Sequence, residues 1–176
     1  FAFSKDKESS GVSMGIRGPV SVHPAFSVSP IDIVDIQITK SVNGDSSGKD
    51  ADKKSRDTMG MKHRVPFGVY VFYGSINCQL AEKTGFTEED ADAIHAALES
   101  LFENDCSSAR PDGSMEIRKV YWWKHNCKSG QLSSAKVHRS LRVEKKEGVD
   151  IPEKFEDYVI TLDKLDGLEP VVSDGV

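Results

Sequence analysis

Residues 55–73, SRDTMGMKHRVPFGVYVFY, join a basic segment directly to an apolar one. The apolar part, Val69–Tyr73, consists mainly of β-branched and aromatic side chains, which favour a pleated and half-buried surface. We therefore predict a core strand there. The polar residues before it cannot be buried without partners, so we expect them to project from the body of the protein. This projection is where we expect the functional residues to lie.

The composition fits a single domain over residues 1–176, because 38% apolar content in a chain of this length suffices for a hydrophobic core. The apolar runs are too short to cross a membrane and no charged leader precedes them, which predicts a soluble cytoplasmic protein with no membrane partner. The first residues, Phe1-Ala2-Phe3, are typical of the end of a strand, so we expect a truncated or cleaved chain.

No pattern of catalytic or metal-ligating residues stands out. The cysteines lack a C-x-x-C spacing, and no two of His63, His125 and His138 have the spacing of a ligand pair. Cys106 and the serines after it lack the glycines of a nucleophile elbow, and a Walker-type phosphate loop is absent. We expect reduced thiols, no catalytic residue, no metal and no cofactor.

The charge is unevenly distributed along the chain. The net charge is −5, yet residues 40–64 contain seven Lys or Arg against four Asp, and the acidic residues concentrate in 88–92 and 144–174. Local charge matters more for binding a polyanion than the total. The sequence therefore predicts a basic arm on an acidic body.

The basic arm is expected to be a β-hairpin. Strand-like residues, Ile36–Val42 and Thr58–Tyr73, flank a loop rich in Gly, Ser and Asn, which favours two antiparallel strands with a mobile tip. We predict that residues 40–66 form a thumb-like insertion. The extended segment before it contains a break at Arg17-Gly18-Pro19, since proline removes a ladder donor.

One convincing helix is predicted, at Thr87–Asn104, with Thr87 as its cap and an apolar stripe for packing on a sheet. Strands are predicted at Met115–Trp123, Val137–Val143 and Phe155–Leu162, with residues 144–176 as a C-terminal extension. The order of elements predicts an α+β fold: a ferredoxin-like, RRM-like palm, in which a helix packs on one face of an antiparallel sheet, with the thumb-like hairpin projecting from it.

Residues Met59–Arg64 have two interpretations. The methionines are either core residues of a hairpin strand or flexible wedges between bases, with Lys62 and Arg64 holding phosphates. Both interpretations stay open on the residues alone. Arg17, beside a glycine, is equally typical of a phosphate contact and of an exposed turn.

Several motifs follow one another in the order of a known family: GIRGPV at 15–20, QITK at 37–40, TMGMKHRVPFG at 58–68, TGFTEED at 84–90, FEND at 102–105, SSAR at 107–110 and KH at 124–125. Over nearly the whole chain the sequence resembles the repeated backbone subunit of the type I-C CRISPR Cascade. Relative to such a subunit, we expect the N-terminal third to be missing.

The resemblance implies a protein of palm, finger and thumb that polymerises along the CRISPR RNA (crRNA) and presents its spacer for pairing with target DNA in antiviral defence. The implied partners are crRNA, copies of the chain itself, other Cascade subunits and, through the guide, target DNA. No catalytic residue is required. The implied RNA-binding residues are Arg17, Lys40, Arg56, Met59, Met61, Lys62, His63, Arg64 and Lys124.

A rival interpretation is an enzyme. Related backbone subunits of type III complexes cut target RNA with an acidic loop residue in a metal-dependent reaction, and acidic residues lie in the corresponding loop here. Lys and Asp mixed in a Gly/Ser tract are more simply a solvated tip. A scaffold that binds protein alone is a third possibility. The acidic candidates are Asp45, Asp50, Asp52 and Asp57.

Overall fold

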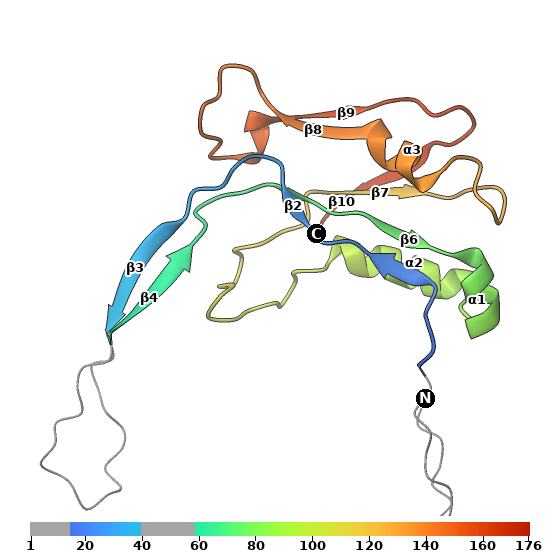
Figure 1. Cartoon of the computed structure of the whole chain (residues 1–176), viewed down its shortest axis with the longest axis horizontal. Coiled ribbons are helices and arrows are strands. Elements are labelled where there is room, and N and C mark those ends of the chain that lie inside the picture. The colour runs from blue at the N-terminus through green and yellow to red at the C-terminus, as the bar shows by residue number, and fades with distance from the viewer. Residues whose placement is uncertain (1–14, 40–58) are drawn as a thin grey trace, which may run out of the picture. The chain divides into compact units, whose positions relative to one another are not determined.

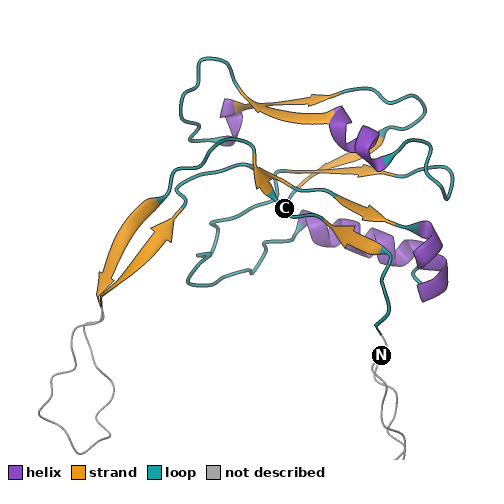
Figure 2. Ribbon diagram, in the orientation of Figure 1, coloured by secondary structure: helices purple, strands orange, loops and turns teal. Residues whose placement is uncertain are grey.

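A computed structural model describes residues 15–39 and 59–176. Helices and small antiparallel sheets occur together in these residues (Figure 2), which confirms the predicted α+β class. The chain divides into two compact units. Of the described residues, unit 1 holds 15–23, 73–140 and 164–176, and unit 2 holds 24–39, 59–72 and 141–163.

Unit 2 contains the predicted hairpin. Strand β3 (Val34–Thr39) pairs antiparallel with β4 (Met59–Arg64), and β2 (Phe26–Ser27) pairs with β5 (Tyr70–Val71). Figure 1 shows β3 and β4 side by side. The antiparallel pairing predicted for the segments that flank the loop is confirmed over Ile36–Thr39 and Met59–Lys62. Of the predicted thumb, residues 40–66, the structure describes only 59–66.

Prolines interrupt this ladder. Two segments connect the β2–β5 pair to the β3–β4 pair. The first runs seven positions along the chain, from Ser27 to Val34, and the second runs six, from Arg64 to Tyr70. Pro30 and Pro66 lie in these gaps, and a residue without a backbone N–H cannot continue a ladder. The interruption leaves short strands on both sides.

The core strand predicted at Val69–Tyr73 is therefore wrong. Only Tyr70–Val71 forms a strand, and Tyr70 is exposed while its apolar neighbours are half-buried. The segment has the residue types of a core strand but pairs with just two residues. A high β-strand propensity does not bury a segment, because burial requires another part of the protein to pack against it. The buried apolar residues of the described chain are Pro19, Val120, Val137, Tyr158 and Leu168.

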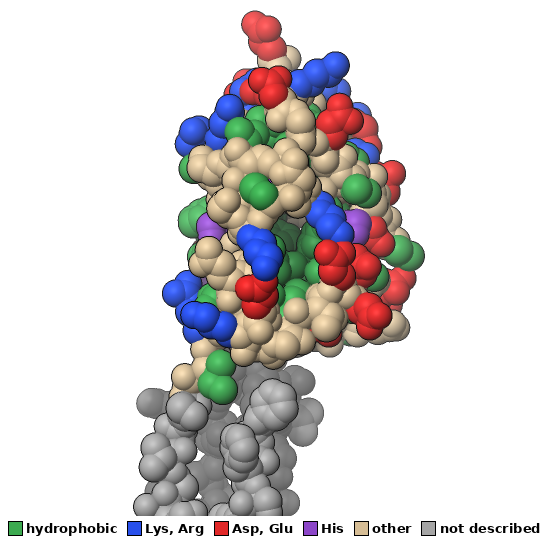
Figure 3. All heavy atoms as spheres, turned by 90° about the vertical axis from the view of Figure 1, so that its right-hand side faces the viewer, with side chains coloured by type: hydrophobic (Ala, Val, Ile, Leu, Met, Phe, Trp, Pro, Cys, Tyr) green, Lys and Arg blue, Asp and Glu red, His purple; other side chains and the backbone are tan. Residues whose placement is uncertain are grey.

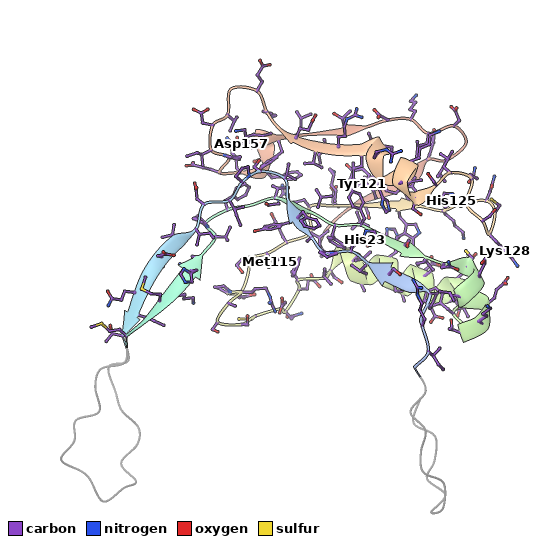
Figure 4. All side chains as sticks on the ribbon, in the orientation of Figure 1. His23, Met115, Tyr121, His125, Lys128 and Asp157 are labelled. Atoms are coloured by element: carbon purple, nitrogen blue, oxygen red, sulfur yellow. The ribbon has the colours of Figure 1, made fainter. Side chains whose placement is uncertain are left out.

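A second hairpin of unit 2 joins β8 (Leu141–Lys145) to β9 (Tyr158–Leu162), with a short 3-10 turn, η1 (Phe155–Asp157), before β9. The buried Tyr158 donates a hydrogen bond from its hydroxyl to Ser29 Oγ at 3.1 Å, which ties β9 to the segment after β2. Asp157, labelled in Figure 4, accepts the backbone N–H groups of Glu153 and Lys154, and these bonds lower the pKa of its carboxyl.

Unit 1 packs a helix on a hairpin. Strand β7 (Lys119–Trp123) pairs with β10 (Pro170–Asp174), and helix α2 (Glu88–Glu99) contacts β7. His95 of α2 stacks on Trp122 with ring centroids 4.8 Å apart. The predicted packing of this helix on a strand pair is confirmed. The unit also contains the strands β1 (Val20–Val22) and β6 (Gly74–Ile76), which pair with each other, and the helices α1 (Cys78–Thr84) and α3 (Ser134–Ser140).

Several boundaries differ from those predicted. The strands predicted over Met115–Trp123 and Phe155–Leu162 begin only at Lys119 and Tyr158. Helix α2 ends at Glu99 instead of Asn104, because the residues after it form two separate turns and Asn104 has a left-handed φ of 58°. The strand predicted over Val137–Val143 begins only at Leu141, since α3 occupies the residues before it. Residues 144–176, predicted as an extension, supply β9 and β10 and thus strands of both units. Strand β10 was not predicted.

Helix α1 was missed although the sequence carries its signals. The Asn77 side chain accepts the N–H of Leu80 at its start, and Gly85 ends it with a left-handed φ of 74°. The described strands pair only in twos, in five separate sheets. A continuous ferredoxin-like palm therefore stays a prediction.

Removing the cap of α2 is expected to destabilise unit 1. Thr87 Oγ1 accepts a hydrogen bond from the backbone N–H of Asp90 at 3.2 Å, and the Asp90 carboxylate accepts one from the backbone N–H of Thr87 at 2.8 Å. Thr87→Ala should lower the free energy of unfolding by about 1 kcal/mol, measured by urea denaturation. Thr87→Ser keeps the hydroxyl and is the control. An equal loss in both variants would contradict the role of the cap.

Candidate nucleic-acid interface

The β3–β4 hairpin has two faces of different chemistry. Side chains alternate across a strand, and direct partners in an antiparallel pair share a face. The register therefore assigns every described residue of the hairpin to one side. The basic face carries Val34, Ile36, Ile38, Gly60, Lys62 and Arg64; the methionine face carries Asp35, Gln37, Thr39, Met59, Met61 and His63.

The basic face combines two cations with an exposed aliphatic row. Arg64 lies opposite Val34 and Lys62 opposite Ile36. The third pair is Ile38 and Gly60, and a Cβ at Gly60 would lie 3.3 Å from Ile38 Cγ1, so the isoleucine packs over the glycine. Long cationic side chains next to exposed aliphatic residues present their charge to solvent while their stems contact apolar surface. This face suits a phosphate backbone.

The methionine face is exposed. Met59 and Met61 are 67% and 55% accessible, so the interpretation as core methionines is wrong. Gln37 Nε2 lies 3.1 Å from Met59 Sδ, and His63 Nδ1 lies 2.5 Å from Asp35 Oδ1. Side chains extend from both sides of the hairpin in Figure 4. Exposed thioethers with an imidazole and an amide offer contacts for a flat apolar group with polar edges.

The structure separates residues that the sequence groups into one motif. Met59 and Met61 lie on the face opposite to Lys62 and Arg64, although all four fall within six positions of one strand. Asp35 was not predicted from the sequence as a partner of His63. The alternation of apolar and polar residues in Val34–Thr39 was the signal, but only the register says which residue faces which. Lys40 and Arg56 lie outside the described residues.

Two predicted contacts lie in unit 1. Arg17 is exposed in the segment before β1. Lys124 follows β7 and forms an ion pair with Glu88 in the first turn of α2. This hydrogen bond raises the pKa of the Lys124 ammonium. A phosphate that binds Lys124 must therefore compete with a carboxylate. The RNA-binding roles of these two residues stay predictions.

The other histidines considered in the sequence have structural partners in unit 1. His125 Nδ1 accepts the backbone N–H of Gln131 at 3.1 Å. The imidazole of His138 stacks on the ring of Tyr73, with ring centroids 4.5 Å apart, and forms an edge contact with the ring of His23, with centroids 5.8 Å apart. Burial lowers the pKa of His138, and the proximity of His23 adds to this effect. These contacts favour roles in packing.

Figure 3 draws both cationic and anionic side chains on the face that it shows. Several cations of unit 1 are in ion pairs: Lys119 with Asp174, Lys128 with Glu82, and Arg110 with Asp105. Each of these cations already has a carboxylate as its partner. The local excess of Lys and Arg remains in residues 40–64, of which β4 is the described part.

In the described part of the chain, no three His, Cys, Asp or Glu side chains form a group that could hold a metal ion. None of the helices described there has the length and apolar character needed to cross a membrane.

No curated protein matches the chain significantly. The family model of CRISPR-associated protein Cas7 matches residues 2–163, which is most of the sequence and includes the whole β3–β4 hairpin. The chain thus belongs to the Cas7 family, the crRNA-binding backbone subunits of Cascade-like complexes.

Proposed function

We propose that this chain is the repeated backbone subunit of a type I-C Cascade, which binds the crRNA guide through the β3–β4 hairpin and presents the spacer for pairing with target DNA. The observation that carries the proposal is the two-faced hairpin in a chain of the Cas7 family. The motifs from Gly15 to His125, which resemble the type I-C subunit, support the subtype.

The chemistry of the hairpin suits a protein that binds a guide of any sequence. Lys62 and Arg64 neutralise phosphates, which every RNA carries, so their attraction does not depend on the bases. The exposed Met59 and Met61 contact a base through dispersion, which every base also supports. Recognition of the target is then left to Watson–Crick pairing by the guide.

The finer parts of the proposal concern residues and fold. We assign the hairpin with residues 40–66 to a thumb and the elements around α2 to an RRM-like palm, supported by the packing of α2 on β7. Lys40 and Arg56 serve as thumb contacts, and Arg17 and Lys124 as palm contacts. Copies of the chain assemble along one guide and join the other Cascade subunits.

The proposal is tested by expressing the chain together with the remaining type I-C subunits and a CRISPR array, and by sequencing the RNA that copurifies. We expect RNAs that each contain one spacer with flanking repeat sequence, and a mass for the complex that requires several copies of the chain. Recovery of the complex without RNA, or with cellular RNA in the proportions of the lysate, would contradict the proposal.

The enzymatic alternative makes the opposite prediction about target RNA. The candidate carboxylates Asp45, Asp50, Asp52 and Asp57 lie outside the described residues. We expect no cleavage when the guide-loaded complex is incubated with labelled complementary RNA and Mg²⁺ or Mn²⁺, because the proposed function needs no acid, base or metal. Cleavage that EDTA abolishes, and that a substitution of one of these aspartates removes, would favour the type III-like alternative.

A further inference from the structure

The methionine face of the hairpin holds an Asp–His pair that the RNA-binding proposal does not explain. Asp35 and His63 are direct cross-strand partners. The Nδ1 atom of the imidazole lies 2.5 Å from Oδ1 of the carboxylate. Both side chains remain largely exposed, at 57% for Asp35 and 64% for His63. The contact is therefore well formed but is not protected from solvent.

Stability is a weak reason for this pair. An ion pair or charged hydrogen bond at the surface contributes about 0–1 kcal/mol. A carboxylate on a hairpin that binds RNA also opposes phosphates, since like charges repel. The pair is better explained by what the carboxylate does to the imidazole. The carboxylate forms a hydrogen bond with Nδ1, which fixes the orientation of the imidazole ring. Nε2 and the flat faces of the ring are left for contact with another group.

The distribution of charge between the faces identifies that group. The two cations of the described hairpin lie on the basic face, and Asp35 lies on the methionine face beside Gln37. A single strand that meets the hairpin therefore lowers its energy by placing phosphates on the basic face and a base on the methionine face. A base is flat, apolar on its faces and polar at its edge, which matches Met59 and Met61 beside an imidazole and an amide.

We propose that Asp35 is a positioning residue that fixes His63, so that the imidazole and the two methionines form one contact surface for a nucleobase. This inference rests on the proposed function, because it divides the RNA contact between the two faces. On the methionine face the carboxylate keeps phosphates away and the imidazole in place. His63 is then a base contact and not a phosphate contact.

The test uses the full chain and single-stranded RNA oligonucleotides in which one base at a time is replaced by 2-aminopurine, whose fluorescence reports stacking. Titrations at several salt concentrations give both the fluorescence change and the salt slope. With Asp35→Ala, the fluorescence change at the contacted position should disappear, with about a fivefold loss of affinity and an unchanged salt slope. Asp35→Asn keeps an oxygen that accepts from Nδ1–H, so it should restore the wild-type fluorescence change.

The matched control is Asp163→Ala. Asp163 is also an exposed carboxylate, and it pairs with Arg142 of β8. It directly follows β9 and lies in the same unit, away from the β3–β4 hairpin strands. The Asp163→Ala variant should show the same fluorescence change and the same salt slope as the wild-type chain.

Three other outcomes would each overturn a different part of the proposal. If Asp35→Ala and Asp35→Asn raise the affinity equally, the carboxylate acts only by repelling phosphates and does not position the ring. If His63→Ala makes the salt slope shallower, His63 contacts phosphate. If the wild-type chain shows no binding to any of these RNAs, the proposed function itself fails, which is a result distinct from binding without a change at the base.

Discussion

Replacing both Lys62 and Arg64 with glutamine is expected to lower the affinity of the chain for single-stranded RNA roughly 25-fold at 0.1 M salt, because each lost phosphate contact removes about 0.7 from the slope of log K against log salt. The slope should therefore become shallower by about 1.4. Both residues lie on the basic face of the hairpin, because side chains two positions apart in a strand share a face. Fluorescence anisotropy of a labelled RNA over a series of salt concentrations measures the two quantities together.

The control must remove the same charge from a different place. Lys145 and Lys146 lie in the same unit, at the end of β8 and in the turn after it. Their replacement by glutamine changes the net charge by the same amount but leaves the hairpin intact. A similar loss of affinity in the two double variants would show that total charge, and not the basic face, attracts the RNA. An unchanged slope in the Lys62 and Arg64 variant would exclude both residues as phosphate contacts.

Replacing both Met59 and Met61 with alanine should weaken RNA binding about 5- to 150-fold, since contact with one base contributes about 1–3 kcal/mol. The salt slope should stay constant because a thioether carries no charge. The two side chains are the most exposed apolar groups on the methionine face, so their truncation leaves no cavity in a core. Assembly on the guide should persist, and chemical probing at nucleotide resolution should show that the displaced base loses its protection or distortion.

Ile36→Ala together with Ile38→Ala is the matched control, because it truncates apolar side chains of the same hairpin on the basic face. Those residues are expected to affect probing of the displaced base much less than the methionines do. Identical probing patterns for the methionine variant and the wild-type chain would refute the assignment of a base to the methionine face. Equal effects of the two double variants would show that the hairpin does not distinguish its faces.

Local interactions explain why some of the fold could be predicted. The start of α2 depends on Thr87 and Asp90, three positions apart, so a short window of sequence specifies it. Helix α1 is bounded by equally local signals at Asn77 and Gly85, so a short window of sequence specifies it as well. By contrast, the burial of Val69–Tyr73 depends on whether a sheet covers it, and no short window contains that information.

The family could be inferred from the order of short motifs, and the family model over residues 2–163 agrees with that inference. The pairing of the two segments around the Gly/Ser loop was also predictable, since strand-like residues flank a turn-rich tract. These features need only the identity of residues and their order along the chain.

The sequence alone determined that the hairpin exists and that it carries two methionines, a histidine and two cations. Only the tertiary structure decided which residues of β3 share a face with these groups, because a shift of one residue in strand register exchanges the partners across the whole hairpin. The register observed here places Asp35 opposite His63 on the methionine face. The alternation of side chains along β4 separates Lys62 and Arg64 from the methionines in any register. The pairing of Asp35 with His63 depends on hydrogen bonds between strands that are far apart in the chain. Together with the alternation along β4, it allows one hairpin to offer different surfaces to phosphate and to base.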